Sequence, residues 1–197
     1  MSADGLRFYN LSHPIGHNMP QWPSPMAPPL VVHKLYYHAM HDFYAVEYDG
    51  IMHRGTHMDT PMHVLPDQPY LDGFELWRFF GNGGVLAIPK GEWEYVEPSD
   101  LEAATPAVEE GDVVIVNTGW HHRYGDNMEY FGHAPGLSEA AAAWLADRRA
   151  RFVGVDTANV DHPLATSLAQ AHRFVGPVIV ELPRRYRQRT GREVVEG

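Results

Sequence analysis

Two segments near the N-terminus alternate apolar and polar residues with the period of a β-strand. Residues 30–38 read LVVHKLYYH and residues 43–51 read FYAVEYDGI, and both are rich in the β-branched and aromatic side chains that strands favour. Only the four residues AMHD, at 39–42, separate them, so we expect two strands joined as a hairpin. The proline-rich segment 11–29 before them predicts an irregular loop, because proline supplies no backbone N–H.

The second half of the chain changes to continuous apolar runs and one helical segment. GVLAIPK at 84–90 and GDVVIVNTGW at 111–120 predict buried strands, the latter of the kind that is covered on both faces. Ser138 is a good N-cap for the alanine-rich segment 139–150, which predicts a helix, and RFVGVD at 151–156 predicts a further strand. A strand, a crossover helix and a strand in this order predict an α/β arrangement of layers.

We expect one domain over residues 1–197, because this length supports a single well-buried core and no repeat, charged block or linker interrupts it. With 15 Lys and Arg against 25 Asp and Glu, the formal net charge is −10, the wrong sign for binding phosphate backbones or anionic lipid. We therefore expect no nucleic acid and no membrane among the partners.

The absence of cysteine excludes thiolate nucleophiles, disulfides and Cys-ligated zinc. Any metal must therefore be held by nitrogen and oxygen ligands. The first residues, MSADGLRFYN, lack the basic and apolar segments of a signal peptide, and no apolar run is long enough to span a bilayer. From this we expect a cytoplasmic protein.

The segment HRGTHMDTPMH, which begins at His53, places three histidines and an aspartate close together. On a strand, at about 3.3 Å per residue, His53 and His57 would lie about 13 Å apart, too far for one ion. On a helix, Asp59 would point to a different side of the axis from His53. An irregular turn can bring the side chains together, and the sequence supplies one, because Gly55 permits a sharp fold and Pro61 stops a helix.

Spacing alone leaves two interpretations of this cluster open. His53, His57 and Asp59 are a nitrogen and oxygen ligand set suited to Zn or Mn, with open positions for water and a substrate oxygen. His63, just beyond them, could then take or give a proton. Alternatively, the four side chains are ordinary polar residues of a turn, although desolvating them together without a cation would be costly.

The same segment resembles the H-x-G-T-H-x-D-x-P-x-H signature of the metal-dependent putative cyclase family, which includes bacterial kynurenine formamidase and isatin hydrolase. The glycine, threonine and proline of the signature match, as do its histidines and aspartate. LSHPI and MPQWP resemble the family's N-terminal loop, and GDVVIVNTGW resembles its central strand. HAPGLSEAAAAWL and FVGVDTANVDHPL resemble its helix and next strand, so the resemblance covers nearly the whole chain.

This resemblance implies that His53, His57 and Asp59 are metal ligands and that His63 is the general acid/base. Family members use Zn or Mn to hydrolyse small amides or cyclic amides. They share a swivelling β/β/α fold in oligomers, so we expect a single α/β domain of this type with a mixed sheet. The resemblance also implies one divalent ion, a small-molecule substrate and a homo-oligomer, either a dimer or a tetramer. Trp22 resembles a substrate-contacting tryptophan of the family, and it fits a surface or interface aromatic equally well.

The chain departs from the family pattern after its central strand. The formamidase branch completes a two-metal site with a later His and Glu, but the candidates here, His172 and Glu181, are spaced more tightly, so we expect one ion. Longer relatives continue past the segment PRRYRQRTGREVVEG, so the chain is a fragment, a short branch, or one half of a site that another subunit completes. Asp156, at the end of a predicted strand, is either a site residue or a turn residue.

Together these observations predict a metal-dependent hydrolase of a small amide or lactam, in which His63 carries a proton to the departing nitrogen. An isatin-like lactam and an N-formylkynurenine-like arylformamide are the expected substrates, and VDTANVDHPLATS is closer to the isatin-hydrolase branch. The alternatives are a lactonase or a cyclising dehydratase of the same family, and a catalytically silent protein that binds a metal or another ligand.

Overall fold

The structure, a computed structural model, describes residues 2–3, 5–23, 28–166 and 177–193. Contacts between residues divide the chain into two compact units. Unit 1 comprises Met1–Trp22 and Met26–Gln68, and unit 2 comprises Pro23–Pro25 and Pro69–Gly197. The expected single domain concerns both units together and stays a prediction.

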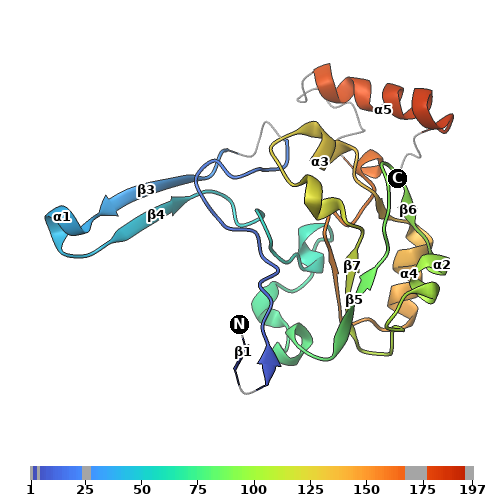
Figure 1. Cartoon of the computed structure of the whole chain (residues 1–197), viewed down its shortest axis with the longest axis horizontal. Coiled ribbons are helices and arrows are strands. Elements are labelled where there is room, and N and C mark those ends of the chain that lie inside the picture. Colours follow the sequence, from blue (N-terminus) through green and yellow to red (C-terminus); the bar gives the residue numbers. More distant parts are fainter. Residues whose placement is uncertain (1, 4, 24–27, 167–176, 194–197) are drawn as a thin grey trace. The chain divides into compact units, whose positions relative to one another are not determined.

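Unit 1 contains a long antiparallel hairpin (Figure 1). Strand β3 (Val31–Tyr36) pairs with β4 (Ala45–Asp49), and the short helix α1 (His38–His41) connects them. Asp42 ends this helix in the left-handed conformation, with φ of 61°, and so turns the chain back into β4. The hairpin lies where the alternating pattern predicts it, but neither strand has a buried residue.

The rest of unit 1 has little regular structure. β1 (Ser2–Ala3) pairs with β2 (Leu6–Arg7), and a 3-10 turn, η1, spans Pro61–His63. The described part of the proline-rich segment 11–29 forms neither helix nor strand, as its composition predicts. Among the described residues of this unit, the buried ones are Met19, Leu30 and Arg54.

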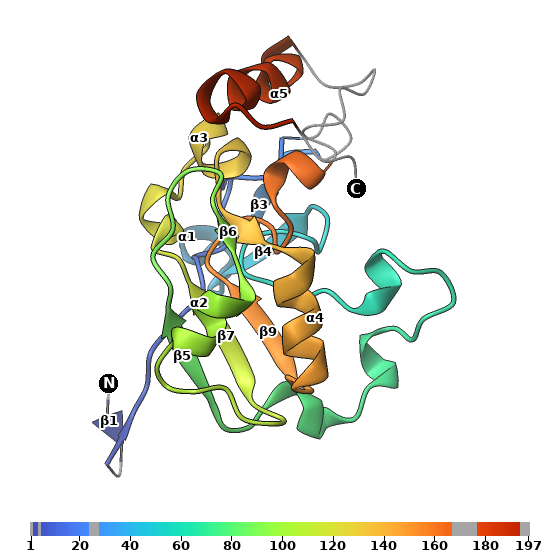
Figure 2. The same cartoon turned by 90° about the vertical axis from the view of Figure 1, so that its right-hand side faces the viewer.

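Unit 2 is built on a parallel sheet of three strands in the order β5 (Gly83–Ala87), β7 (Val113–Asn117) and β9 (Phe152–Val155). The helices α2 (Pro98–Ala103) and α4 (Glu139–Asp147) lie on one face of this sheet (Figure 2). Because helices connect successive parallel strands, the sheet has the layered architecture that the sequence predicts. The α/β class is therefore confirmed, with parallel pairing here and antiparallel pairing in unit 1.

The core of unit 2 lies between the sheet and these two helices. Leu86, Val114 and Val116 of the sheet belong to one buried cluster with Leu101 of α2 and Leu145 of α4. Burying an aliphatic side chain of this size contributes about 1.5–3 kcal/mol. The alternate residues of β7 are only half-buried, so this strand is covered fully on one face and partly on the other.

Helix α4 begins where its capping residue predicts and ends early. The Oγ of Ser138 accepts a hydrogen bond from a backbone N–H of the first turn at 3.1 Å. The helix stops at Asp147, three residues before the end of the alanine-rich segment, because Arg149 has a φ of 52°. The N–H of Ala150 then bonds the carbonyl of Leu145 and closes the turn.

Unit 2 also contains a smaller parallel sheet and further helices and turns. β6 (Tyr95–Val96) pairs in parallel with β8 (Gly136–Leu137). The remaining helices and turns are η2 (Leu71–Gly73), η3 (Leu76–Phe79), η4 (Trp120–Arg123), α3 (Met128–Gly132), η5 (Pro163–Ala165) and α5 (Pro177–Thr190). None of the helices in the described part of the chain has both the length and the apolar character that crossing a membrane requires.

Asp156 directly follows β9 and binds the turn that follows β7. Its Oδ1 accepts the N–H and the hydroxyl of Thr118 at 2.9 and 2.7 Å, and its Oδ2 accepts the N–H and Nδ1–H of His121 at 3.3 and 2.9 Å. Burial by itself would raise the pKa of Asp156, but the hydrogen bonds from His121 and Thr118 outweigh burial and lower that pKa. Each of these contacts reaches across 35 or 38 residues of the chain, so Asp156 ties together the carboxyl ends of two neighbouring strands.

We predict that Asp156→Asn lowers the free energy of unfolding by about 1.5–3 kcal/mol at neutral pH, because an amide cannot accept all these bonds. A carboxyl whose pKa is lowered in the folded state stabilises the protein above its unfolded pKa of about 3.9. That contribution is lost as the pH falls through the folded pKa. The difference between parent and variant in urea titrations should therefore shrink below about pH 4. Asp126→Asn, at an exposed carboxyl of the same unit, is the control, and a difference that does not change with pH would contradict this account.

Candidate metal centre

An irregular loop between β4 and η1 carries the histidine cluster. Gly55 has a φ of 62°, in the left-handed region that favours glycine. A Cβ at this position would lie 2.8 Å from Cε of Met19, so the backbone also approaches that side chain closely. Pro61 then begins η1. The chain thus turns sharply between His53 and Asp59, as the glycine and the proline predict.

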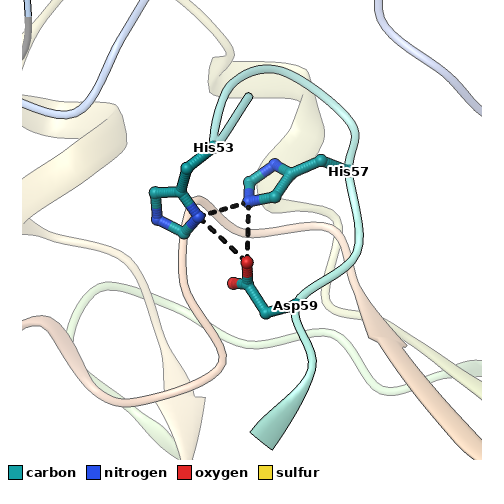
Figure 3. A group of neighbouring side chains, drawn as sticks. All are labelled: His53, His57 and Asp59. Carbon is teal, nitrogen blue, oxygen red and sulfur yellow. Dashed lines mark hydrogen bonds and ion pairs between the residues drawn. The ribbon is translucent and has the colours of Figure 1, made fainter. Parts of the chain in front are cut away.

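His53, His57 and Asp59 point toward one another across this turn (Figure 3). Nδ1 of His53 lies 3.0 Å from Oδ1 of Asp59 and 2.8 Å from Nε2 of His57, and Nε2 of His57 lies 3.6 Å from the same Oδ1. One ligand atom from each residue thus falls within 4.8 Å of the others. All three residues are exposed enough for an ion and a small molecule to reach them.

The hydrogen bonds of His57 prepare one of its nitrogens to bind an ion. Its Nδ1 lies 2.8 Å from the carbonyl oxygen of Gly55, which can only accept, so Nδ1 carries the proton and Nε2 presents a lone pair. Nδ1 of His53 must then donate its own proton to this Nε2 or to Asp59. A divalent cation could replace that single shared proton and engage all three atoms at once.

The donor set fits a divalent transition metal. Two imidazole nitrogens and one carboxylate oxygen suit Zn or Mn, and three protein ligands leave positions open for water and substrate. Among the residues that the structure describes, no other group of three or more His, Asp or Glu side chains converges as closely.

Of the other residues singled out from the sequence, the structure describes His63 and Trp22 but not His172. The ring of His63 stacks on that of His53, with centroids 4.4 Å apart and planes at 21°, so His63 lies beside the three candidate ligands. Trp22 is half-buried in the irregular segment that also contains Gln21. His172 lies outside the described residues, so its role in a second site stays a prediction.

Two residues to which the sequence assigned no contact hold this loop in place. Arg54 is only 5% exposed, and its guanidinium donates to the side chain of Gln21 and, at 2.6 Å, to the carbonyl of Pro28. The hydroxyl of Thr56 accepts the N–H of His13 at 3.0 Å. These partners are distant in sequence, and an arginine beside a histidine carries no signal of burial, so spacing could not reveal either contact.

The amino-acid sequence is similar to those of several known proteins. Residues 9–162 match the sequence model of the family described as Putative cyclase. The chain is 26% identical over 114 residues to an isatin hydrolase of Roseibium aggregatum. The matched region covers 49% of this chain and 43% of that protein. It is 29% identical over 127 residues to a kynurenine formamidase of Delftia acidovorans, which covers 62% of this chain and 55% of that protein. The chain spans about half the length of these two curated relatives.

Solved structures show the same fold. Isatin hydrolase A from Ralstonia solanacearum gives a TM-score of 0.71 at 21% identity, over 87% of this chain and 73% of that chain. An isatin hydrolase bound to the product analogue thioisatinate gives 0.69 at 22% identity, over 78% and 68% of the two chains. The family resemblance and the fold class expected from the sequence are both confirmed.

Proposed function

We propose that this chain, which belongs to the Putative cyclase family, is a metal-dependent hydrolase of a small amide or cyclic amide. The observation that carries the proposal is the convergence of His53, His57 and Asp59 within 4.8 Å. Relatives named isatin hydrolase and kynurenine formamidase support hydrolysis as the reaction. An isatin-like lactam and an N-formylkynurenine-like arylformamide are therefore the substrates that we propose.

In this proposal, His53, His57 and Asp59 hold one divalent ion, Zn or Mn. Such an ion would polarise the substrate carbonyl and lower the pKa of a water molecule beside it. Amide hydrolysis moves one proton from the attacking water to the departing nitrogen. His63 stacks on His53 without belonging to the ligand set, so its imidazole can carry that proton. Trp22 would pack against the planar ring of the substrate.

We predict that the parent protein retains about one Zn or Mn ion per chain after desalting and that Asp59→Ala retains none. Asp59 is the only oxygen donor among the three converging residues, and two imidazoles alone form an incomplete site. Metal analysis of the desalted proteins measures this. Asp49→Ala, which removes an exposed carboxylate at the end of β4, is the matched control and should keep the ion. Equal retention by the parent and Asp59→Ala would refute the ligand assignment.

We predict that His63→Ala keeps its metal but loses about 10²–10⁴-fold in kcat, which is roughly 3 to 5 kcal/mol of transition-state stabilisation. Hydrolysis of isatin and of N-formylkynurenine, followed by absorbance beside metal analysis, measures this. Loss of the metal would instead make His63 a ligand, and an unchanged rate would exclude it as the proton carrier.

The same assays decide between catalysis and its alternatives. Turnover of a lactone or of a cyclising substrate, with neither amide hydrolysed, would favour the lactonase or dehydratase function. A parent protein that retains its metal and acts on none of these compounds would favour a binding protein.

We also propose that the functional unit is a homo-oligomer formed through the hairpin. Among the described residues, the sheet of the hairpin consists of β3 and β4 alone, and an isolated sheet of that size is marginally stable. Its large apolar side chains are exposed, namely Leu35, Tyr36, Met40, Phe43, Tyr44, Val46 and Tyr48. An identical hairpin from a second copy has the same open edges and the same apolar side chains, so a two-fold pairing would cover both.

We predict that the parent protein is at least a dimer at micromolar concentration by light scattering. Charged substitutions on one strand, Val46→Glu with Tyr48→Glu, should shift it to the monomer, because a pairing interface cannot bury unpaired carboxylates. Val160→Glu replaces an equally exposed valine of unit 2 and should leave the oligomer intact. A monomeric parent would remove this proposal.

A further inference from the structure

The three residues that separate His53 from His57 all contact the N-terminal segment 13–22. Thr56 accepts a hydrogen bond from the N–H of His13 at 3.0 Å. Gly55 packs directly against Met19, which is 8% exposed. Arg54 donates to the side chain of Gln21. The part of the loop between the two candidate histidine ligands is therefore attached to this segment.

Arg54 makes the most selective of these contacts. One of its terminal nitrogens donates to Oε1 of Gln21 and the other to the carbonyl of Pro28, at 2.6 Å. The two acceptors are seven positions apart, and the planar, forked guanidinium holds both in one fixed geometry. Trp22 is the residue next to Gln21. Arg54 therefore holds the side chain of the residue next to this tryptophan.

Arg54 is buried with few hydrogen-bond partners. The residue is 5% exposed, both acceptors are uncharged, and Nε is buried without a hydrogen-bond partner among the described residues. Burying a cation without a carboxylate is costly, and so is an unpaired N–H. The two contacts from the terminal nitrogens thus decide where the side chain lies, and losing either would leave a buried charge poorly satisfied.

A bound ion would also restrict the backbone of Arg54. His53 precedes it directly and His57 follows three positions later, so an ion held by both histidines would restrict the loop between them. Ordering of the loop by an ion then favours the contacts of Arg54, and those contacts favour the arrangement that binds the ion. Such coupling between two sites is reciprocal.

We propose that Arg54 is a positioning residue that couples the metal centre to Gln21 and thereby places Trp22 for the substrate. The role of Trp22 toward substrate rests on the proposed function, whereas the coupling of the ion to Trp22 does not. Arg54 itself touches neither the ion nor the substrate in this proposal. It acts through the segment that it holds.

Four variants separate coupling from charge and from simple stabilisation. Arg54→Lys keeps the charge and removes the fork, whereas Arg54→Met removes both. Gln21→Ala removes one acceptor and leaves Arg54 in place, as a milder variant should either substitution prevent folding. Arg7→Met, at the exposed arginine of β2, is the matched control for loss of a cation in the same unit. Because a lost positive charge would by itself strengthen binding of a dication, Arg54→Lys is the decisive variant.

The first measurement needs no turnover. Zn²⁺ is titrated while the emission of Trp22 is followed, as the difference between each protein and its Trp22→Phe counterpart. We expect a Trp22 response in the parent and in Arg7→Met. In Arg54→Lys that response should be lost and the Kd for Zn²⁺ should rise by about 5- to 100-fold, the range typical of linked sites. Gln21→Ala should weaken binding in the same direction, and combining it with Arg54→Lys should add little.

The second measurement uses proteins saturated with Zn²⁺. Arg54→Lys should raise KM for isatin or N-formylkynurenine more than it lowers kcat, because a misplaced Trp22 affects binding rather than the chemical step. A variant that is only less stable in thermal unfolding, with the parent's Kd, Trp22 response and KM, would overturn the proposal. A parent that binds Zn²⁺ with an Arg54-dependent Trp22 response but hydrolyses neither amide would sink the proposed function and leave the coupling standing. A parent that binds no Zn²⁺ would overturn both.

Discussion

The candidate centre depends on one constraint: three ligand atoms from positions two and four residues apart must meet at a single point. Neither a strand nor a helix permits this, so the backbone turns at Gly55 with a positive φ and packs on Met19. An irregular loop has no ladder of hydrogen bonds to hold it, so other segments must supply its partners. Arg54 and Thr56 find those partners in the N-terminal part of the chain. The positions of the ligands therefore depend on two segments, the ligand loop and the N-terminal segment. The sequence signature covers only the loop.

Local signals explain which elements could be predicted. The hairpin follows from alternation, and the start of α4 follows from the Oγ of Ser138, because each depends on residues that are neighbours in sequence. The early end of α4 at Asp147 could not be predicted, since it depends on the positive φ of Arg149, a residue type that ordinarily favours helix. Nor does an apolar run such as that of β7 say which of its faces the helices cover, because that depends on how α2 and α4 pack in three dimensions.

The same distinction separates the predicted from the unpredicted residues of the site. His53, His57, Asp59 and His63 lie within one short segment, so spacing and chemistry suffice to group them, and the structure brings them together. The contacts of Arg54 and Thr56 reach across 26 to 43 residues. Such contacts depend on the tertiary structure. Arginine is also a residue type that is usually found at the surface, so its burial could not be expected.

The two units differ in the size of their hydrophobic cores, and this affects how much a bound ion would contribute to the stability of each. Unit 2 has a cluster of buried aliphatic side chains on a parallel sheet, whereas the described residues of unit 1 bury only Met19, Leu30 and Arg54. A cation that binds only the folded loop, at a hundred times its Kd, would add about 2.7 kcal/mol to stability. For a unit with so small a core, that amount is comparable to what one buried aliphatic side chain contributes. Metal binding and folding of the ligand loop would then be one linked equilibrium. The parallel sheet of unit 2, which has its own core, has no such need of an ion.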